Sequence, residues 1–163
     1  MKRPENCDSI DELIREGKEC ITSYIIAHGA FGPPEPEPGA YFQRALDLLQ
    51  QSDLEDHDRE SKIRSQLGWY LGARGKFEAG IEQMEAAQVL KPDTLNTKLT
   101  LAQMHHLQAE NGPREHQREH YAAASKAYAH VARLVSFLSF LKYELIVNAV
   151  RDQLLARRIP EAA

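Results

Sequence analysis

The sequence predicts an all-α protein built from antiparallel helix pairs. Apolar residues recur every three to four positions along most of the chain, and no stretch alternates as a half-buried strand does. Prolines and glycines interrupt this pattern at short intervals, so consecutive helices are joined by short connections. A chain of 163 residues can bury a core without metal or disulfide, and we expect one domain over residues 1–163.

The composition narrows the classes of function. With 42% hydrophobic residues, 27% charged residues and a net charge of -4, the chain has no excess of positive charge for nucleic acid. Cys7 and Cys20 form no C-x-x-C pair, which favours a reducing, cytoplasmic compartment and argues against a disulfide framework or a cysteine-rich zinc site. The apolar run 135–150 contains Lys142 and Glu144 and is shorter than the roughly 20 residues of a membrane span. We expect no membrane, nucleic acid or cofactor, with a tail anchor as the alternative for the apolar run.

The first third of the chain predicts two helices around a proline-rich loop. Ser9 and Glu12 form a capping box at the start of a first helix over 9–28. Four prolines then favour an extended loop over 29–39. A short helix follows from 40 to about 52. The acidic segment after it lacks the glycine and final glutamate of a calcium loop and is interpreted as a solvated connection.

The remaining sequence predicts five helices in quick succession, at about 58–74, 76–90, 94–109, 114–134 and 137–157. Gly75 separates the first two of these, and Asp93 is the expected cap of the third. Pro113 suits the first turn of the fourth.

Residues 61–94, "SKIRSQLGWYLGARGKFEAGIEQMEAAQVLKPDT", carry a repeat-like pattern of small and large residues. The matching positions are Leu67, Gly68, Gly75, Phe77, Ala87, Leu90 and Pro92. This unit resembles the tetratricopeptide repeat family. In that pattern Gly68 and Ala87 allow two helices to approach closely. Arg64, Leu71, Gly80 and Met84 depart from it.

Neighbouring segments extend the resemblance to two or three irregular repeats in a repeat region over 40–134, with 137–157 as a capping helix. The resemblance implies a superhelical solenoid. A generic helical bundle with one chance match is the alternative.

The resemblance also implies a function in protein binding, as an adaptor or chaperone-type subunit that holds a peptide or partner helix in a concave groove. First helices of the repeats would line that groove. The expected groove residues are Lys62, Gln66, Trp69, Ala73, Asn96, Leu99, Gln103 and His106. Trp69 is either the anchor for an apolar ligand or a packed core residue.

One motif points to a different function. His116, Glu119 and His120 follow the His-x-x-Glu-His pattern of inverted zinc proteases, with Glu144 as the leading third ligand. However, the apolar stripe Tyr121, Ala124, Tyr128, Val131 and Val135 places this pattern toward water. We therefore expect no catalytic or metal site, and a small zinc hydrolase is the alternative function. His105 and His106 could meet His116 or His120 across neighbouring helices.

The last helix has more apolar residues than one core-facing stripe requires, among them Leu145, Ile146, Val147 and Val150. Either the rest of the chain covers them, or they form a homodimer or hetero-complex interface. In the second case the chain is an obligate subunit of a larger assembly, such as a secretion complex.

Overall fold

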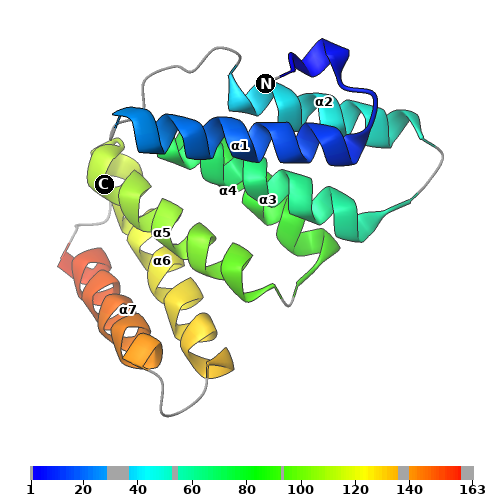
Figure 1. Ribbon diagram of the computed structural model, residues 1–163. Coiled ribbons are helices and arrows are strands. Elements are labelled where there is room, and N and C mark those ends of the chain that lie inside the picture. The colour runs from blue at the N-terminus through cyan, green and yellow to red at the C-terminus, as the bar shows by residue number, and fades with distance from the viewer. Residues whose placement is uncertain (1, 29–36, 53–54, 93, 136–139, 159–163) are drawn as a thin grey trace. The chain divides into compact units, whose positions relative to one another are not determined.

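The computed structural model describes residues 2–28, 37–52, 55–92, 94–135 and 140–158 (Figure 1). These residues form a short 3-10 helix and seven α-helices, without a strand among them, which confirms the all-α prediction. The elements are η1 (Pro4–Asn6), α1 (Ile10–His28), α2 (Pro38–Gln51), α3 (His57–Ala73), α4 (Phe77–Leu90), α5 (Leu95–Asn111), α6 (Arg114–Leu134) and α7 (Phe140–Arg158). None of these helices is both long enough and apolar enough to cross a bilayer.

Local capping signals explain where the first helices begin. The Ser9 hydroxyl accepts a hydrogen bond from the Glu12 N–H at 3.2 Å, as the capping-box pattern predicts. α2 begins at Pro38, two residues before the predicted start, because proline tolerates the first helical position. Asp56 caps α3 by accepting from the Arg59 N–H at 2.9 Å, so this acidic residue belongs to a helix start and not to a loop alone.

The later helix starts differ more from the prediction. α5 begins after Thr94, and the predicted cap Asp93 lies outside the described residues. Pro113 stands just before α6, where its carbonyl accepts from the His116 N–H at 3.1 Å. It therefore occupies the capping position of α6 rather than the first turn. Residues 29–36 of the predicted proline-rich loop are also outside the described residues.

Gly75 ends α3 in the way the sequence predicts. Its φ of 75° is in the left-handed region that favours glycine. The Lys76 N–H donates to the Leu71 carbonyl and the Gly75 N–H to the Gly72 carbonyl, both at 2.9 Å. This pair of bonds is the Schellman motif, which satisfies the last carbonyls of α3 and lets α4 begin two residues later.

The chain forms two compact units, and the single domain expected over residues 1–163 stays a prediction. Unit 1 contains residues 1–92 and unit 2 contains residues 93–163. Helices adjacent along the chain make the main packing contacts within each unit. Each unit is therefore described by itself.

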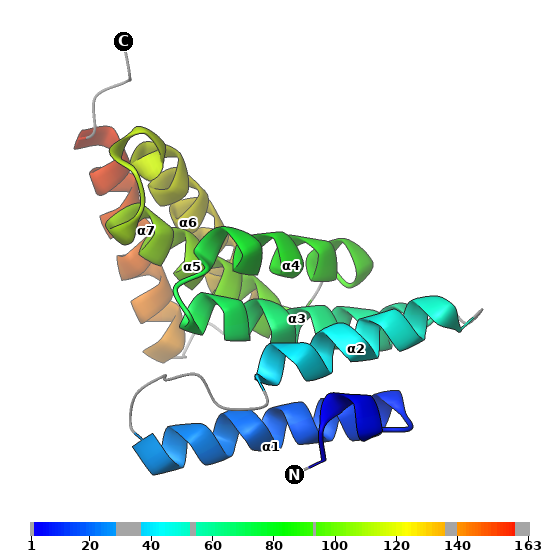
Figure 2. The same ribbon diagram turned by 90° about the horizontal axis from the view of Figure 1, so that it is seen from above.

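Unit 1 packs α1, α2, α3 and α4 in sequence, as Figure 2 shows. Its core joins residues from α1, α2 and α3, including Leu13, Phe42 and Ile63. The N-terminal segment is held to this core because the Tyr41 hydroxyl donates to the Lys2 carbonyl at 2.6 Å. Burial raises the pKa of Tyr41 to about 12, so its hydroxyl keeps the proton it donates.

α3 and α4 approach each other closely at two glycines. A Cβ atom placed on Gly68 would lie 2.9 Å from the carbonyl oxygen of Gly80 and 2.9 Å from Cγ of Met84. Ala87 is fully buried, and its carbonyl accepts from the Ser61 hydroxyl at 2.9 Å. The close approach expected at Gly68 and Ala87 is therefore confirmed.

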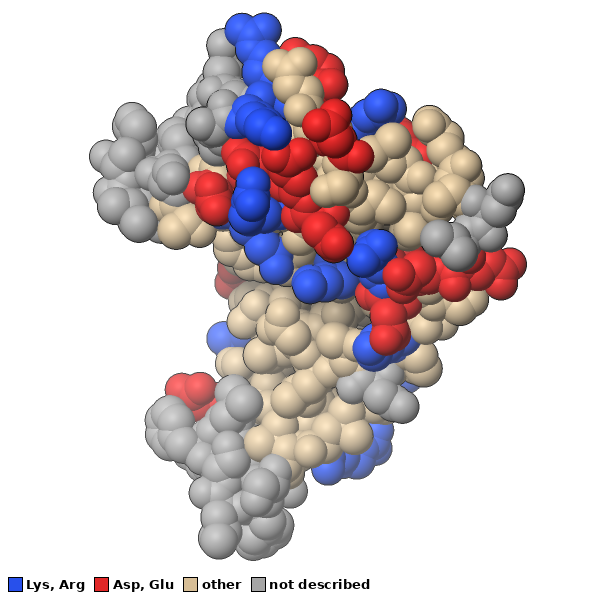
Figure 3. Space-filling view, turned by 45° about the vertical axis from the view of Figure 1, so that its right-hand side comes forward, with Lys and Arg blue, Asp and Glu red and all other residues tan. Residues whose placement is uncertain are grey.

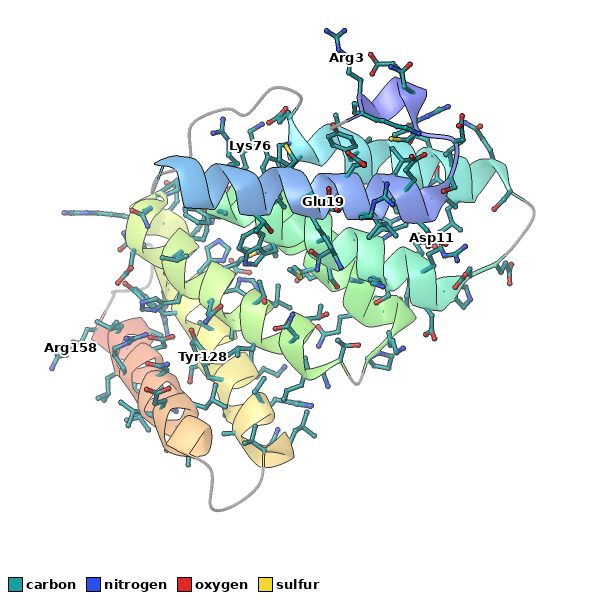
Figure 4. All side chains as sticks on the ribbon, viewed as in Figure 1. Arg3, Asp11, Glu19, Lys76, Tyr128 and Arg158 are labelled. Atoms are coloured by element: carbon teal, nitrogen blue, oxygen red, sulfur yellow. The ribbon has the colours of Figure 1, made fainter. Side chains whose placement is uncertain are left out.

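Unit 2 consists of α5, α6 and α7, which lie side by side in Figures 1 and 2. The predicted stripe of α6 faces the core: four of its residues are buried and Val135 is half-buried. Tyr128 points inward between the helices in Figure 4, whereas Arg158 points away from the end of α7. The core of unit 2 also contains Ala102 from α5 and Leu145 from α7.

Candidate functional site

The candidate binding residues of unit 1 share one face of α3. Lys62 and Trp69 are exposed, and Gln66 and Ala73 are half-buried. Their spacing of four, three and four residues places them along one side of the helix. The other sides of α3 pack on α2 and α4 through residues such as Ile63 and Leu67. The face is therefore partly open to solvent.

Trp69 is the largest side chain on this face. It is 37% exposed, so most of the indole packs against the protein while one part faces solvent. Gly72, on the same side of the next turn, is buried. A partly exposed indole offers a large apolar area to a ligand.

The four candidate residues of α5 do not share one open face. Asn96 and Gln103 are exposed. Leu99 packs against the core cluster of unit 2, and His106 is held by side chains of α5 and α7. Of these four residues, therefore, Asn96 and Gln103 are exposed to solvent, while Leu99 and His106 contribute to packing.

His106 belongs to a polar side-chain network that centres on the buried Asp152. Asp152 is fully buried, and its Oδ1 atom lies 3.0 Å from Nδ1 of His106 and 3.1 Å from Nε of Arg151. Nε2 of His106 lies 3.2 Å from Oε1 of Glu110. Oδ2 of Asp152 has no hydrogen-bond partner among the described residues. A buried carboxylate needs such donors, so His106 and Arg151 together hold Asp152 in the unit.

The His-x-x-Glu-His residues lie on α6 but do not converge on one point. His116 and Glu119 are exposed, with 53% of the His116 side chain open to solvent. His120 is half-buried and faces α5, and Glu144 is exposed on α7. Within the described ranges, no three His, Cys, Asp or Glu side chains are grouped closely enough to hold a metal ion. A zinc hydrolase site requires three protein ligands.

His120 instead meets His105, one of the two histidines that the sequence analysis considered as its partner. Their Nδ1 atoms lie 3.1 Å apart, and the ring centroids are separated by 5.4 Å. One ring must donate and the other accept, so the pair is satisfied when both rings are neutral. Burial, together with the neighbouring His120, lowers the pKa of His105 to about 4.

This histidine pair makes the stability of the protein pH-dependent. The folded pKa of His105 is below the ordinary value, so the unfolded chain takes up the proton first as the pH falls below about 6.5. Stability is lost from there down to about pH 4. We expect the loss of unfolding free energy between pH 7 and pH 4.5 to be about 2 kcal/mol smaller in His105→Leu than in the native chain.

Urea denaturation at the two pH values measures this difference, with His116→Leu as the control because His116 is exposed on α6. The control should keep the native pH dependence. If the stability of His105→Leu depended on pH as that of the native chain does, His105 would not be the source of the pH dependence.

Opposite charges are interleaved on the surface of unit 1. Figure 3 shows acidic and basic side chains beside one another on the face turned to the viewer. On α1, for example, Arg15 lies 3.1 Å from Glu16, and between helices Lys91 of the α4 end lies 2.9 Å from Asp58 of α3. The hydrogen bond from Arg15 lowers the pKa of Glu16. The Glu16 carboxylate is buried, whereas exposed pairs such as Lys91–Asp58 contribute little to stability and make a mixed, solvated surface.

Comparison of the chain with protein-family models, curated proteins and solved structures finds no match.

The sequence analysis missed Asp152 as a site-forming residue. Within the segment "VRDQL", the local sequence indicates that Asp152 is a solvated residue beside Arg151. Only the position of α7 against α5 turns it toward His106.

Proposed function

We propose that the protein is a binding adaptor or chaperone-type subunit that holds a peptide or partner helix on the open faces of irregular tetratricopeptide-like repeats. The observation that carries this proposal is the nested pair α3–α4, with small residues at the contact and an exposed tryptophan on the first helix. In such a repeat, close packing of two helices fixes the position of the first-helix face that a ligand meets.

The contacts between α3 and α4 support an antiparallel repeat. Ser61 near the start of α3 is bonded to Ala87 near the end of α4. Farther along α3, Arg64 donates to Gln83 at 3.0 Å, and Gly68 faces Gly80. Residue numbers that rise on one helix and fall on the other are the signature of two helices running in opposite directions. We further propose that such pairs stack as a superhelical solenoid.

The chemistry of the α3 face suits an extended peptide or a helix with one large apolar residue. Trp69 supplies apolar contact area, while Gln66 and Lys62 can bond to main-chain carbonyls or carboxylates of the ligand. Asn96 and Gln103 offer the same kind of polar group on α5. Binding on the α3 face would then depend mainly on the indole, with Gln66 and Lys62 fixing the register of the ligand.

The test uses peptides selected on the full-length chain from a displayed library. Trp69→Ala should weaken the selected peptides by about tenfold or more, because truncation of an interface tryptophan commonly costs 2 kcal/mol or more. Trp69 is the only tryptophan of the chain, so its fluorescence also reports the contact directly. Anisotropy with labelled peptide gives the affinity.

Val89→Ala is the matched control, because Val89 is an exposed apolar residue on α4, 83% open to solvent. This control should bind as the native chain does. Selected peptides that bind Trp69→Ala at full strength and leave the tryptophan emission unchanged would refute the proposed role of the α3 face.

A further inference from the structure

A groove runs between α6 and α7 in unit 2, separate from the α3 face. It has a volume of about 670 Å³. The core-facing residues of α6 include Ala124 and Tyr128, and the groove is lined by the residues one position later, Ser125 and Ala129. At about 100° per residue, the groove therefore lies beside the face that packs on α5. The Ser125 hydroxyl donates to the Ala149 carbonyl at 2.7 Å and joins the two helices along the groove floor.

The shape of the groove can accommodate another helix. Its floor consists mostly of small side chains, so an incoming helix can approach the two backbones closely. These are Ala122, Ser125, Ala129, Ala132, Ala149 and Ala156. Ile146 and Val150 form an apolar wall and are each about half exposed, at 46% and 50%. On α6 the lining extends from Arg118 to Arg133, roughly 22 Å along the axis, which matches a helix of three to four turns.

The rim of the groove is positively charged. Arg118, Lys126 and Arg133 come from α6, and Arg157 comes from the end of α7. Of the described residues that line the groove, none is Asp or Glu. The chain as a whole has a net charge of -4, so this basic rim is a local feature and not a reflection of composition.

We propose that the groove binds an amphipathic helix of a partner protein, three to four turns long, with an apolar face flanked by acidic residues. The apolar face would cover Ile146, Val150 and the alanine floor, and the acidic flanks would pair with Lys126 and Arg133. A second copy of this chain fits less well, because a two-fold contact through the groove would place the two basic rims against each other. This proposal does not depend on the α3 face.

The choice of a helix over a lipid surface follows from where the apolar atoms lie. The alanine side chains line the bottom of a hollow between two helices, where a rod can reach them and a flat bilayer surface cannot. A neighbouring apolar hollow on α7, bounded by Val147 and Leu154, also carries basic residues, Arg151 and Arg158. The partner helix can extend its contacts over this second hollow.

The test uses labelled synthetic amphipathic peptides of about 15 residues, a length that spans the roughly 22 Å of the groove when the peptide is helical. The peptides are made in several registers, with leucine on one face. One set carries glutamate on both flanks, and a matched set carries lysine. With the full chain, the best glutamate peptide should bind about tenfold more tightly than its lysine counterpart. Lys126→Glu combined with Arg133→Glu should reverse this preference.

A steric variant checks the location of the site. Ala129 is exposed on the groove floor, so Ala129→Trp fills the groove without disturbing the core, and it should weaken the glutamate peptide by about tenfold or more. Leu107→Trp, at an exposed position on α5 that does not line the groove, is the control and should bind normally. Circular dichroism shows whether each variant is folded.

Three results would overturn the proposal: no binding of any glutamate peptide, equal binding of both sets, or binding that Ala129→Trp leaves intact. Vesicles of phosphatidylserine provide the last comparison. If they bind the native chain and the peptides show no charge preference, the groove is a lipid site and the helix assignment is wrong.

Discussion

Replacing His106 with alanine is expected to lower the free energy of unfolding by about 3 kcal/mol. Asp152 is fully buried, and His106 is one of the two side chains among the described residues that lie within bonding distance of its Oδ1 atom. Removing the imidazole leaves a buried carboxylate that Arg151 alone must stabilise, and it opens a gap beside Tyr121, whose ring packs edge-on against His106. Urea denaturation followed by circular dichroism measures the loss.

A double-mutant cycle shows whether the charge is the cause. His106→Leu with Asp152→Leu removes both partners, so the double variant should be more stable than the sum of the single losses predicts. Glu110→Ala is the control, because this carboxylate also contacts His106 but is about half exposed. Its effect should stay below about 1 kcal/mol. Additive losses in the cycle would contradict a stabilising contact between His106 and Asp152.

Gly68→Val is expected to destabilise unit 1 by about 3 kcal/mol. Even a single Cβ atom at this position would lie 2.9 Å from the Gly80 carbonyl oxygen, and this backbone atom can move only if α3 and α4 separate. Gly68→Ala should cost less, about 1 to 2 kcal/mol, because the helix gains propensity while the same contact is strained. Thermal and urea unfolding both report the loss.

Gln66→Val is the control, because it introduces the same residue, valine, at a half-buried position of the same helix. It should cost no more than about 0.5 kcal/mol, the difference in helix propensity. If Gly68→Val were as mild as this control, the close approach of α3 and α4 would be wrong, and with it the repeat proposed for residues 61–94.

The parts of the fold that could be predicted from the sequence depend on short-range signals. Ser9 with Glu12 and the turn at Gly75 act within a few residues, and the apolar stripe on α6 repeats at the helical period. Gly68 and Ala87 could be predicted because their small size matters only at a helix contact. α2 and α3 start earlier than predicted because Pro38 begins α2 and Asp56 caps α3. The segments around these two residues have the composition of loops, so the sequence analysis placed the helix starts later.

The site was harder to predict because it depends on which face of each helix meets a neighbour. The α3 residues share a face that spacing alone defines. On α5, the same kind of spacing predicted Leu99 and His106 as groove residues, but both pack inside unit 2. Nothing local distinguishes them from Asn96 and Gln103. The burial of Asp152, likewise, is set by helix packing between residues about 45 positions apart, beyond the reach of any local pattern.

Within each unit, the helices pack chiefly against their neighbours along the chain, and this packing has a kinetic consequence. Contacts between near neighbours require little loop closure, so the search for the native arrangement is short, and we expect folding on the order of milliseconds or faster. Within each unit, loss of a terminal helix leaves the remaining neighbouring helices in contact, so local opening can begin at an end of the unit. Hydrogen exchange should then be faster in the terminal helices α1 and α7 than in the buried part of α3.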